Sequence, residues 1–544
     1  MKRLILLSLA LAATMLSWAD EAEIADFRVV CKDGTVTNFY GADTEITFSE
    51  DAAILYITEG TNLISYAVSG IEAIEFAQSG AYRGKYSYEG NHVNVSIDSA
   101  DDTSYTTVNE VIPDSESDEK GDFYEHYKPA YTATITYNGD KATCSFSPKK
   151  PSVANVIVKG THVTAMMNDV DGPKINYVLK GSTTNGSFKL YSDKKAQITL
   201  SGVSITNPTG AAINIQSGKT MLVQLAEGTT NSLKDGSTYT SVNDEQQKGT
   251  FFSEGQLVFA DKGTLNVESL GGHGIASDDY VRVRSGKISI FNTKKDGIST
   301  KECFIMYGGT LDINAGQDGI DVGEGYIEIG GGKINIHAVD EGITASYEGD
   351  EDTGVVDPLI TPYINIKGGL IKVSTTGDKG HGIRAMSTFS MSGGIIQSTT
   401  KGAGSKALMS EGNMSLTGGK VTAITEGAAL YEAEVKDLSS SAAIRSKGVL
   451  TITGTTVGVK STGTGGKGIN NAGDIVVKDS RVTILATGAT HKSNNLDSRS
   501  RGVSTDGKLS VDGGTLFVKS YDAPLHGIHT FSGNAVYGGY QIGE

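Results

Sequence analysis

Acidic residues recur in this chain at a nearly constant spacing. Asp296, Asp318 and Glu341 each precede a Gly-Ile pair, at intervals of 22 and 23 residues. A second series stands five residues after the glycine of the same unit: Asp279, Glu302 and Glu324. If each interval is one turn of a solenoid, equivalent residues lie about 4.8 Å apart. Two carboxylates at that distance repel by roughly 3 to 4 kcal/mol at an effective dielectric near 20, so we expect a compensating cation.

Ca²⁺ is the cation that suits such a surface. It takes six to eight oxygen ligands from carboxylates, backbone carbonyls and water, all of which a turn of a β-solenoid supplies. The predicted ligands are Asp278, Asp279, Asp296, Glu302, Asp318, Asp321, Glu324, Asp340 and Glu341. The alternative is that these acids extend into solvent, where the same repulsion falls to about 1 kcal/mol or less.

The repeat that carries these acids also defines the secondary structure. Between residues 293 and 346, each copy runs from acid-Gly-Ile through an alternating apolar segment to Gly-Gly, and then through a second alternating segment. Apolar residues recur every second position and never every third or fourth, which indicates strands and excludes helices. The sequence therefore predicts an all-β fold, a right-handed parallel β-helix with three short strands per coil of 22 to 25 residues.

The repeat extends in both directions from this stretch. Longer steps are expected to hold loop insertions, whose closure costs grow slowly with length. The equivalent positions are expected at Gly274-Ile275, Gly382-Ile383, Lys406-Ala407, Ala443-Ile444, Gly468-Ile469, Gly502-Val503 and Gly527-Ile528.

Four regions are expected along the chain. Residues 1–19 have a basic start, an apolar centre and a small-residue end near Ala19, which is typical of a cleaved secretory signal peptide. Residues 20–79 predict a small antiparallel β module, with a hairpin turn at Lys32-Asp33-Gly34-Thr35. Residues 80–129 are polar and acidic, as in a linker or a loosely ordered strap, and residues 130–544 are expected to form the β-helix.

Composition excludes some partners. The formal charge is −16, and removal of Lys2 and Arg3 with the signal peptide makes it −18, so nucleic acid is not expected as a partner. No other stretch is long and apolar enough for a membrane span, which predicts a secreted or cell-surface protein. We expect a monomer. Cys31 and Cys144 could pair with each other, but with three cysteines in all, buried unpaired thiols are the preferred interpretation.

Several phrases together resemble one known family. They are ITYNGDKAT (135–143), SGVSITNPTGAAINIQSGK (201–219), GTFFSEGQL (249–257), HGIASDDYVRV (273–283) and EGITASYEG (341–349). The chain resembles bacterial carbohydrate-binding β-helix proteins that are similar in shape to pectate lyases. This resemblance implies a secreted protein that binds cellulose or acidic, polygalacturonate-like plant polysaccharide, with calcium in its coils. Residues 24–79 separately resemble a short N-terminal module of secreted Bacteroidetes proteins.

The side chains that would contact sugar are less well marked. Aromatic faces commonly pack on sugars, and the candidates are Tyr280, Tyr307, Tyr326, Tyr347 and Tyr363, together with Lys301; the tyrosines could equally be packing residues. We expect a non-catalytic binding protein. One alternative is a calcium-dependent polysaccharide lyase, whose base would come from Arg282, Arg284, Lys294, Lys295 or Lys301. The other is a surface adhesin or structural solenoid.

Overall fold

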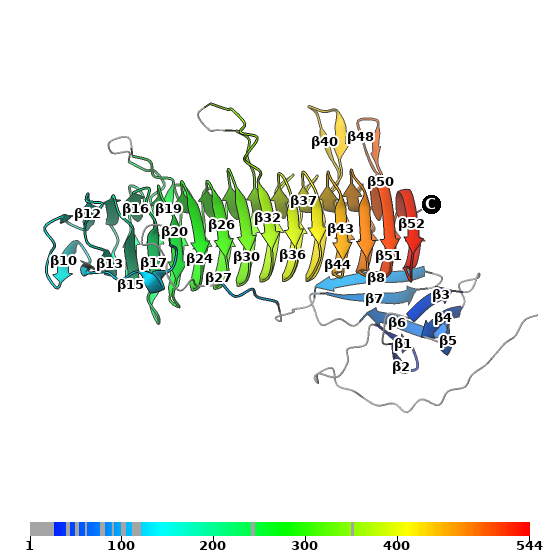
Figure 1. The fold of residues 1–544 in the computed structure, drawn as a ribbon. Coiled ribbons are helices and arrows are strands. Elements are labelled where there is room, and N and C mark those ends of the chain that lie inside the picture. The colour runs from blue at the N-terminus through cyan, green and yellow to red at the C-terminus, as the bar shows by residue number, and fades with distance from the viewer. Residues whose placement is uncertain are drawn as a thin grey trace, which may run out of the picture.

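A long solenoid of short parallel strands makes up most of the protein in the computed structural model (Figure 1). The structure describes residues 27–39, 44–48, 54–59, 62–76, 82–89, 92–99, 105–110, 121–240, 245–349 and 353–543. The signal peptide predicted at 1–19 lies outside these residues. Among the described residues, 41 strands belong to one continuous, mostly parallel system, in which each strand of the regular coils pairs with the third strand along the chain. The all-β solenoid with three strands per coil is thereby confirmed.

Three parallel sheets form the walls of the solenoid. The first sheet contains β16 (Ile213–Gln216), β19 (Gly249–Ser253), β22 (His273–Ser277), β25 (Ile298–Thr300), β28 (Ile320–Val322), β31 (Ile343–Ala345), β34 (Ile383–Ala385), β37 (Lys406–Ser410), β42 (Ala442–Ser446), β45 (Lys467–Asn471), β50 (Val503–Asp512) and β52 (Leu525–Ser532). The second contains β17 (Met221–Leu225), β20 (Leu257–Ala260), β23 (Tyr280–Val283), β26 (Cys303–Met306), β29 (Tyr326–Ile329), β32 (Tyr363–Ile366), β35 (Phe389–Met391), β38 (Met414–Leu416), β43 (Leu450–Thr453) and β46 (Ile475–Lys478). The third contains β15 (Ala196–Thr206), β18 (Thr230–Lys234), β21 (Thr264–Glu268), β24 (Lys287–Phe291), β27 (Thr310–Asn314), β30 (Lys333–Ala338), β33 (Leu370–Thr375), β36 (Ile395–Thr400), β39 (Lys420–Thr425), β44 (Thr456–Ser461), β47 (Arg481–Ala486), β51 (Thr515–Ser520) and β53 (Val536–Gln541).

The interior is a stack of identical apolar positions. Ile275, Ile298, Ile320, Ile343 and Ile383 pair in register along the first sheet, and each is fully buried. The glycine before each isoleucine is required by the packing. A Cβ on Gly319 would lie 2.4 Å from both Ile336 Cγ2 and the carbonyl oxygen of Gly342. The Gly-Gly corners have a different cause, because their second residue, such as Gly309 at φ 82°, adopts the left-handed conformation.

Two of the expected repeat positions are wrong. Ile383 pairs with Leu408 of the next coil. The repeat position in that coil is therefore Ala407-Leu408 and not Lys406-Ala407. In the last coil, Val503 pairs with Leu525, whereas Ile528 is 71 % exposed and falls outside the repeat. Both errors arise where the glycine of the motif is replaced or where an unrelated Gly-Ile pair lies nearby, because the sequence phrase alone does not show strand register.

The amino-terminal end of the solenoid is less regular. It consists of β9 (Tyr131–Asn138), β10 (Lys141–Ser147), β11 (Ala154–Lys159), β12 (His162–Met167), β13 (Ile175–Thr183) and β14 (Ser187–Ser192). β9 pairs antiparallel with β10, and β11 pairs antiparallel with β12, whereas the pairs β9–β13, β12–β14 and β13–β15 are parallel. Antiparallel hairpins therefore precede the parallel coils at this end.

The N-terminal module contains two small antiparallel sheets. One consists of β2 (Val36–Phe39), β1 (Phe27–Cys31), β6 (Ile71–Phe76), β7 (Tyr82–Glu89) and β8 (His92–Ser99), and the other of β3 (Thr44–Phe48), β4 (Ile54–Glu59) and β5 (Asn62–Ala67). A short 3₁₀ turn, η1 (Val68–Gly70), follows β5. The core of the module includes Phe517 of β51, so the module packs against the last coils of the solenoid. All three cysteines are free; Cys303 is buried, and Cys31 and Cys144 are half-buried.

The expectation of a linker over 80–129 needs correction. Its first part forms strands β7 and β8 of the N-terminal module. Its later described parts, residues 105–110 and 121–130, form a strap along the solenoid that includes the 3₁₀ turn η2 (Tyr124–His126). The amide of Val108 donates to Gly330, and the Thr106 hydroxyl accepts from the amide of Gly394 at 2.7 Å.

Candidate functional site

The column of residues before the glycine lies at the start of the first sheet and includes buried acids. The amide of Asp318 donates to Asp296 Oδ1 at 3.1 Å, and the amide of Glu341 donates to Asp318 Oδ1 at 2.8 Å. Each of these carboxylates therefore accepts a hydrogen bond from the next coil. His273 Nδ1 lies 2.9 Å from Asp296 Oδ2, which gives the first acid of the column a partner. The column has a structural role whether or not a metal binds.

Three acids meet at the end of the acidic part of this column. Asp318, Asp340 and Glu341 each have a carboxylate oxygen within 4.8 Å of the others. Burial, followed by the repulsion from Glu341, Asp296 and Asp321, raises the pKa of Asp318. Burial also raises the pKa of Glu341, with Asp340 as the next cause. The nearby cation is Arg384, whose Nη1 lies 3.6 Å from Glu341 Oε1.

This cluster offers carboxylate oxygens, which are the type of ligand that calcium takes. Ca²⁺–oxygen distances of about 2.3 to 2.6 Å place two ligand oxygens up to about 5 Å apart, and the three carboxylates meet that limit. Asp318 and Glu341 are largely buried, so their negative charge is screened little by solvent. Asp340, Asp318 and Glu341 are the residues that could hold the ion, and Asp296 and Asp321 lie next to them.

The acids of the second predicted column have several different protein partners. Lys248 pairs with Asp278 at 2.6 Å, and Lys301 pairs with Glu324 at 3.1 Å. Asp279 accepts a hydrogen bond from Gln256, and burial and the neighbouring Glu302 raise its pKa. Lysines from adjacent coils thus provide part of the compensation that we expected from calcium. Lys301, predicted to bind sugar, is one of them.

The tyrosines predicted to bind sugar take several different roles. The strap covers Tyr280, whose hydroxyl donates to Asp122 at 2.5 Å, and Tyr347 is only 8 % exposed, so neither presents an open ring face. Tyr307 donates to Glu328. Tyr326 and Tyr363 stack on each other with ring centroids 5.0 Å apart.

The strap also occupies the arginines considered as lyase bases. Arg282 pairs with Asp122 at 2.7 Å and with Glu110, and Arg284 pairs with Glu110 at 2.6 Å and with Glu125 at 2.9 Å. Both guanidinium groups also lie over the ring of Phe123. These arginines hold the strap on the second sheet and are not placed to meet a ligand.

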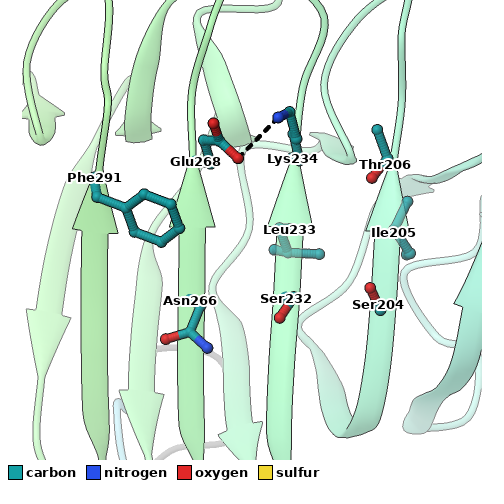
Figure 2. Close-up of a pocket in the computed structure, with 9 residues that line it drawn as sticks. All are labelled: Ser204, Ile205, Thr206, Ser232, Leu233, Lys234, Asn266, Glu268 and Phe291. Atoms are coloured by element: carbon teal, nitrogen blue, oxygen red, sulfur yellow. Dashed lines mark ion pairs between the residues drawn. The ribbon is translucent and has the colours of Figure 1, made fainter. Parts of the chain in front are cut away.

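A groove on the outer face of the third sheet was not predicted. It has a volume of about 470 Å³ and crosses strands β15, β18, β21 and β24. Figure 2 shows its side chains, which are Ser204, Ile205, Thr206, Ser232, Leu233, Lys234, Asn266, Glu268 and Phe291. The ring of Phe291 is 38 % exposed, and Lys234 pairs with Glu268 at 2.9 Å. One feature of the sequence could have indicated this groove. Phe291 stands at a solvent-facing position of an alternating strand, where the other residues are polar.

Small hydrogen-bonding side chains continue along this face. Ser204, Ser232 and Asn266 pair in register on successive strands, so their side chains form a row across the sheet. The row continues through Ser289 on β24 and Asp312 on β27. An apolar ring beside a row of polar groups is a general feature of pockets that bind polar ligands with defined faces.

Comparisons with known proteins give one matching family. A family profile described as "Carbohydrate-binding domain-containing protein" matches residues 162–465. A curated protein of the same description from Acetivibrio thermocellus is 30% identical over 118 residues, which cover 21% of this chain and 41% of that protein. The chain thus spans about two fifths of the curated relative. The N-terminal module lies outside the matched residues.

One solved structure was also found. It is described as the polysaccharide lyase-like protein from C. thermocellum, in a gadolinium derivative. The alignment has a TM-score of 0.38 and 24% sequence identity, and it covers 45% of this chain and 91% of that chain. Among the described residues, no helix has the length and apolar character needed to cross a membrane.

Proposed function

We propose that this chain, which belongs to the family of carbohydrate-binding domain-containing proteins, is a secreted, non-catalytic protein that binds plant cell-wall polysaccharide. The observation that carries the proposal is the groove around Phe291, since the family match covers the residues that build it. The apolar face of a sugar ring can pack on the phenylalanine, while sugar hydroxyls bond to Ser232, Asn266 and Glu268. We take the coils to be right-handed, as parallel strand crossovers almost always are.

The groove suits a long, neutral chain such as cellulose. It lies on an open sheet face and crosses several strands, so a polymer can follow the row of polar groups from coil to coil. The paired charges of Lys234 and Glu268 offer both a donor and an acceptor to hydroxyl groups without adding net charge.

We also propose that Asp318, Asp340 and Glu341 hold Ca²⁺. Their proximity and the burial of Asp318 and Glu341 support this proposal. When bound, calcium would supply positive charge that removes the repulsion among the three carboxylates. The backbone amide that donates to Asp318 keeps that carboxylate oriented toward the cluster.

The groove is tested by substituting its aromatic ring. Phe291→Ala should weaken cellulose binding by about 1 to 2 kcal/mol, or about 5- to 30-fold in Kd, because it removes the apolar platform. Val476→Ala is the matched control, since Val476 has the same exposed fraction of 38 % on the second sheet. Binding is measured by depletion onto insoluble cellulose and by titration with a soluble cello-oligosaccharide. Equal affinities for wild type and Phe291→Ala would refute the groove as the binding site.

A second candidate function, a calcium-dependent lyase, is favoured by one observation. Arg384 lies beside the acidic cluster, and its Nε is buried without a hydrogen-bond partner among the described residues. A cation there could contact the carboxylate of a uronate chain. Incubation with polygalacturonate and calcium, followed by an absorbance assay for unsaturated uronate, decides between the two, because only elimination creates the new double bond. Product formation that is lost in Arg384→Gln would establish the lyase in place of the binding protein.

A further inference from the structure

Two β-hairpins project from the same side of the solenoid near its carboxyl-terminal end (Figure 1). The first consists of β40 (Leu430–Glu432) and β41 (Asp437–Ser439), and the second of β48 (His491–Ser493) and β49 (Leu496–Ser498). Both are inserted between a strand of the third sheet and the next strand of the first sheet. β41 and β49 contact each other, so the hairpins form two adjacent walls.

A pocket of about 260 Å³ lies between these walls. The hairpins contribute Asp437, Leu438, Asp497 and Ser498, and the solenoid and its loop contribute Lys467, Arg499 and Arg501. The second hairpin is fixed closely on the coil beneath it. Gly465 leaves no room for a side chain, because a Cβ there would lie 2.6 Å from His491 Cβ and 2.8 Å from Ser498 Cβ.

Among the described residues, no carboxylate lies within ion-pair distance of the basic groups of the pocket, although Asp437 attracts Lys467 and Asp522 attracts Arg501 from further away. Lys467 Nζ donates to Ser498 Oγ at 3.4 Å, and Arg501 Nη1 to Ser504 Oγ at 3.5 Å, both of which are long contacts. In the part of the chain that the structure describes, neither of these residues nor Arg499 forms an ion pair. Elsewhere on the solenoid, basic side chains are paired with carboxylates. Examples are Lys248 and Lys301, and also Arg282 and Arg284 beneath the strap.

Burial makes these unpaired charges costly. It lowers the pKa of Lys467 to about 8, with the repulsion from Arg501 and Arg445 as the next causes. It lowers the pKa of Arg501 as well, and Arg499 adds to that effect. A bound anion would relieve both the desolvation and the mutual repulsion.

The pocket also contains acceptors for hydroxyl groups. Asp437 and Asp497 line it from the two hairpins, and both side chains are exposed. Carboxylates in such positions accept hydrogen bonds from sugar hydroxyls. An inorganic anion would use only the bases, whereas a uronate sugar has a carboxylate for the bases and hydroxyls for the two aspartates.

We propose that this hairpin pocket binds a uronate residue of an acidic polysaccharide, with its carboxylate on Lys467 and Arg501 and its hydroxyls on Asp437 and Asp497. The inference rests on the proposed function in taking the anion to be carried by a glycan. The pocket is separate from the groove at Phe291 and from the acidic cluster at Asp318, and it needs no calcium. A planar guanidinium such as that of Arg501 can bind a carboxylate through two parallel hydrogen bonds.

The test uses the full-length protein in EGTA, so that calcium cannot bridge protein and glycan. Affinities for polygalacturonate, dextran sulfate and soluble neutral cellulose derivatives are measured by titration calorimetry for the wild type and for Arg501→Gln and Lys467→Met. Lys478→Met, an exposed lysine on β46, is the control for general charge loss. We expect Arg501→Gln and Lys467→Met to weaken polygalacturonate binding by about tenfold or more, which is the scale of one charge-assisted hydrogen bond. The control should change it less than about twofold, and neutral-glycan binding should stay unchanged.

Several results would overturn the inference. Equal losses in Lys478→Met and Arg501→Gln would reduce the effect to long-range charge. Unchanged polygalacturonate binding in Arg501→Gln and Lys467→Met, with cellulose binding intact, would remove the pocket but leave the groove and the proposed function. If Arg501→Gln and Lys467→Met weaken the binding of dextran sulfate alone, the ligand of the pocket would be a sulfate ester and not a uronate. A wild type that binds no glycan would instead refute the proposed function itself.

Discussion

Substitution of one buried lysine should make the protein more stable at neutral pH. Lys406, at the start of β37, is 6 % exposed, and its Nζ donates to the Gly404 carbonyl at 2.6 Å and to Ser439 Oγ at 2.8 Å. Burial lowers its pKa from 10.5 to about 8, with the repulsion from Arg445 as the next cause. Lys406→Met keeps the length of the side chain and removes the charge.

The size and the pH dependence of this gain in stability follow from the shift in the pKa of Lys406. The unfolded chain binds this proton more tightly than the folded one, so the lysine destabilises the fold fully below pH 8 and not at all above pH 10.5. A shift from 10.5 to about 8 corresponds to about 3 kcal/mol. Methionine loses the two hydrogen bonds, which costs about 1 to 2 kcal/mol. Lys406→Met should therefore be more stable than wild type by about 1 to 2 kcal/mol at pH 7, and less stable at pH 10.5.

Urea unfolding followed by circular dichroism at pH 7, 9 and 10.5 measures this difference. The comparison between variant and wild type at each pH cancels the titration of other groups, including the tyrosines. Lys401→Met, in an exposed position just after the last residue of β36, should show no change of sign. A variant that is less stable than wild type at pH 7, or a difference that stays constant with pH, would refute the reasoning.

Three further predictions concern the cluster, the core and the strap. EGTA should lower the melting temperature of wild type but not of Asp318→Asn, because calcium at about 100 times its Kd stabilises the fold by about 2.7 kcal/mol; a wild type that melts identically with and without calcium would exclude the metal site. Gly319→Ala should cost about 1 to 3 kcal/mol in urea unfolding, since its Cβ would overlap Ile336 and the next coil; unchanged stability would mean that the coils yield there. Asp122→Ala should cost about 3 to 5 kcal/mol, because it leaves Arg282 and Tyr280 without a shared partner under the strap; a loss below about 1 kcal/mol would show that Glu110 alone satisfies Arg282.

The solenoid could be predicted because its interior repeats one physical requirement. Each coil must place an isoleucine in the interior and have no side chain on the residue before it. The Gly-Ile pair in the sequence shows both requirements. Where the glycine becomes alanine, as at Ala407, the phrase disappears although the strand pairing continues. The N-terminal module and strap could not be delimited, because the strands at 82–89 and 92–99 lie in a polar, acidic stretch that also suits a linker.

The candidate sites were harder to predict from the sequence. The groups that neutralise their charged side chains come from other coils or from the strap. Glu324 and Lys301 are 23 residues apart in sequence but adjacent across two coils, so their ion pair is visible only with the register known. The partners of Arg282 come from the strap, about 160 residues earlier in the chain. The groove at Phe291 depends on four strands that share no motif.

The column before the glycine changes charge along the solenoid, and this change would account for the two proposed sites, one for a cation and one for an anion. It reads His273, Asp296, Asp318 and Glu341, followed by His381, Lys406, Ala442, Lys467 and Arg501. The position does not require one particular side chain, since the amide of the next coil bonds to Asp318 Oδ1 in one case and to His381 Nδ1 in another. Because the backbone tolerates either charge, the acidic part can gather a cation at Asp318. The basic part, at Lys467 and Arg501, can receive an anionic sugar on a protein whose overall charge of −16 repels acidic glycans.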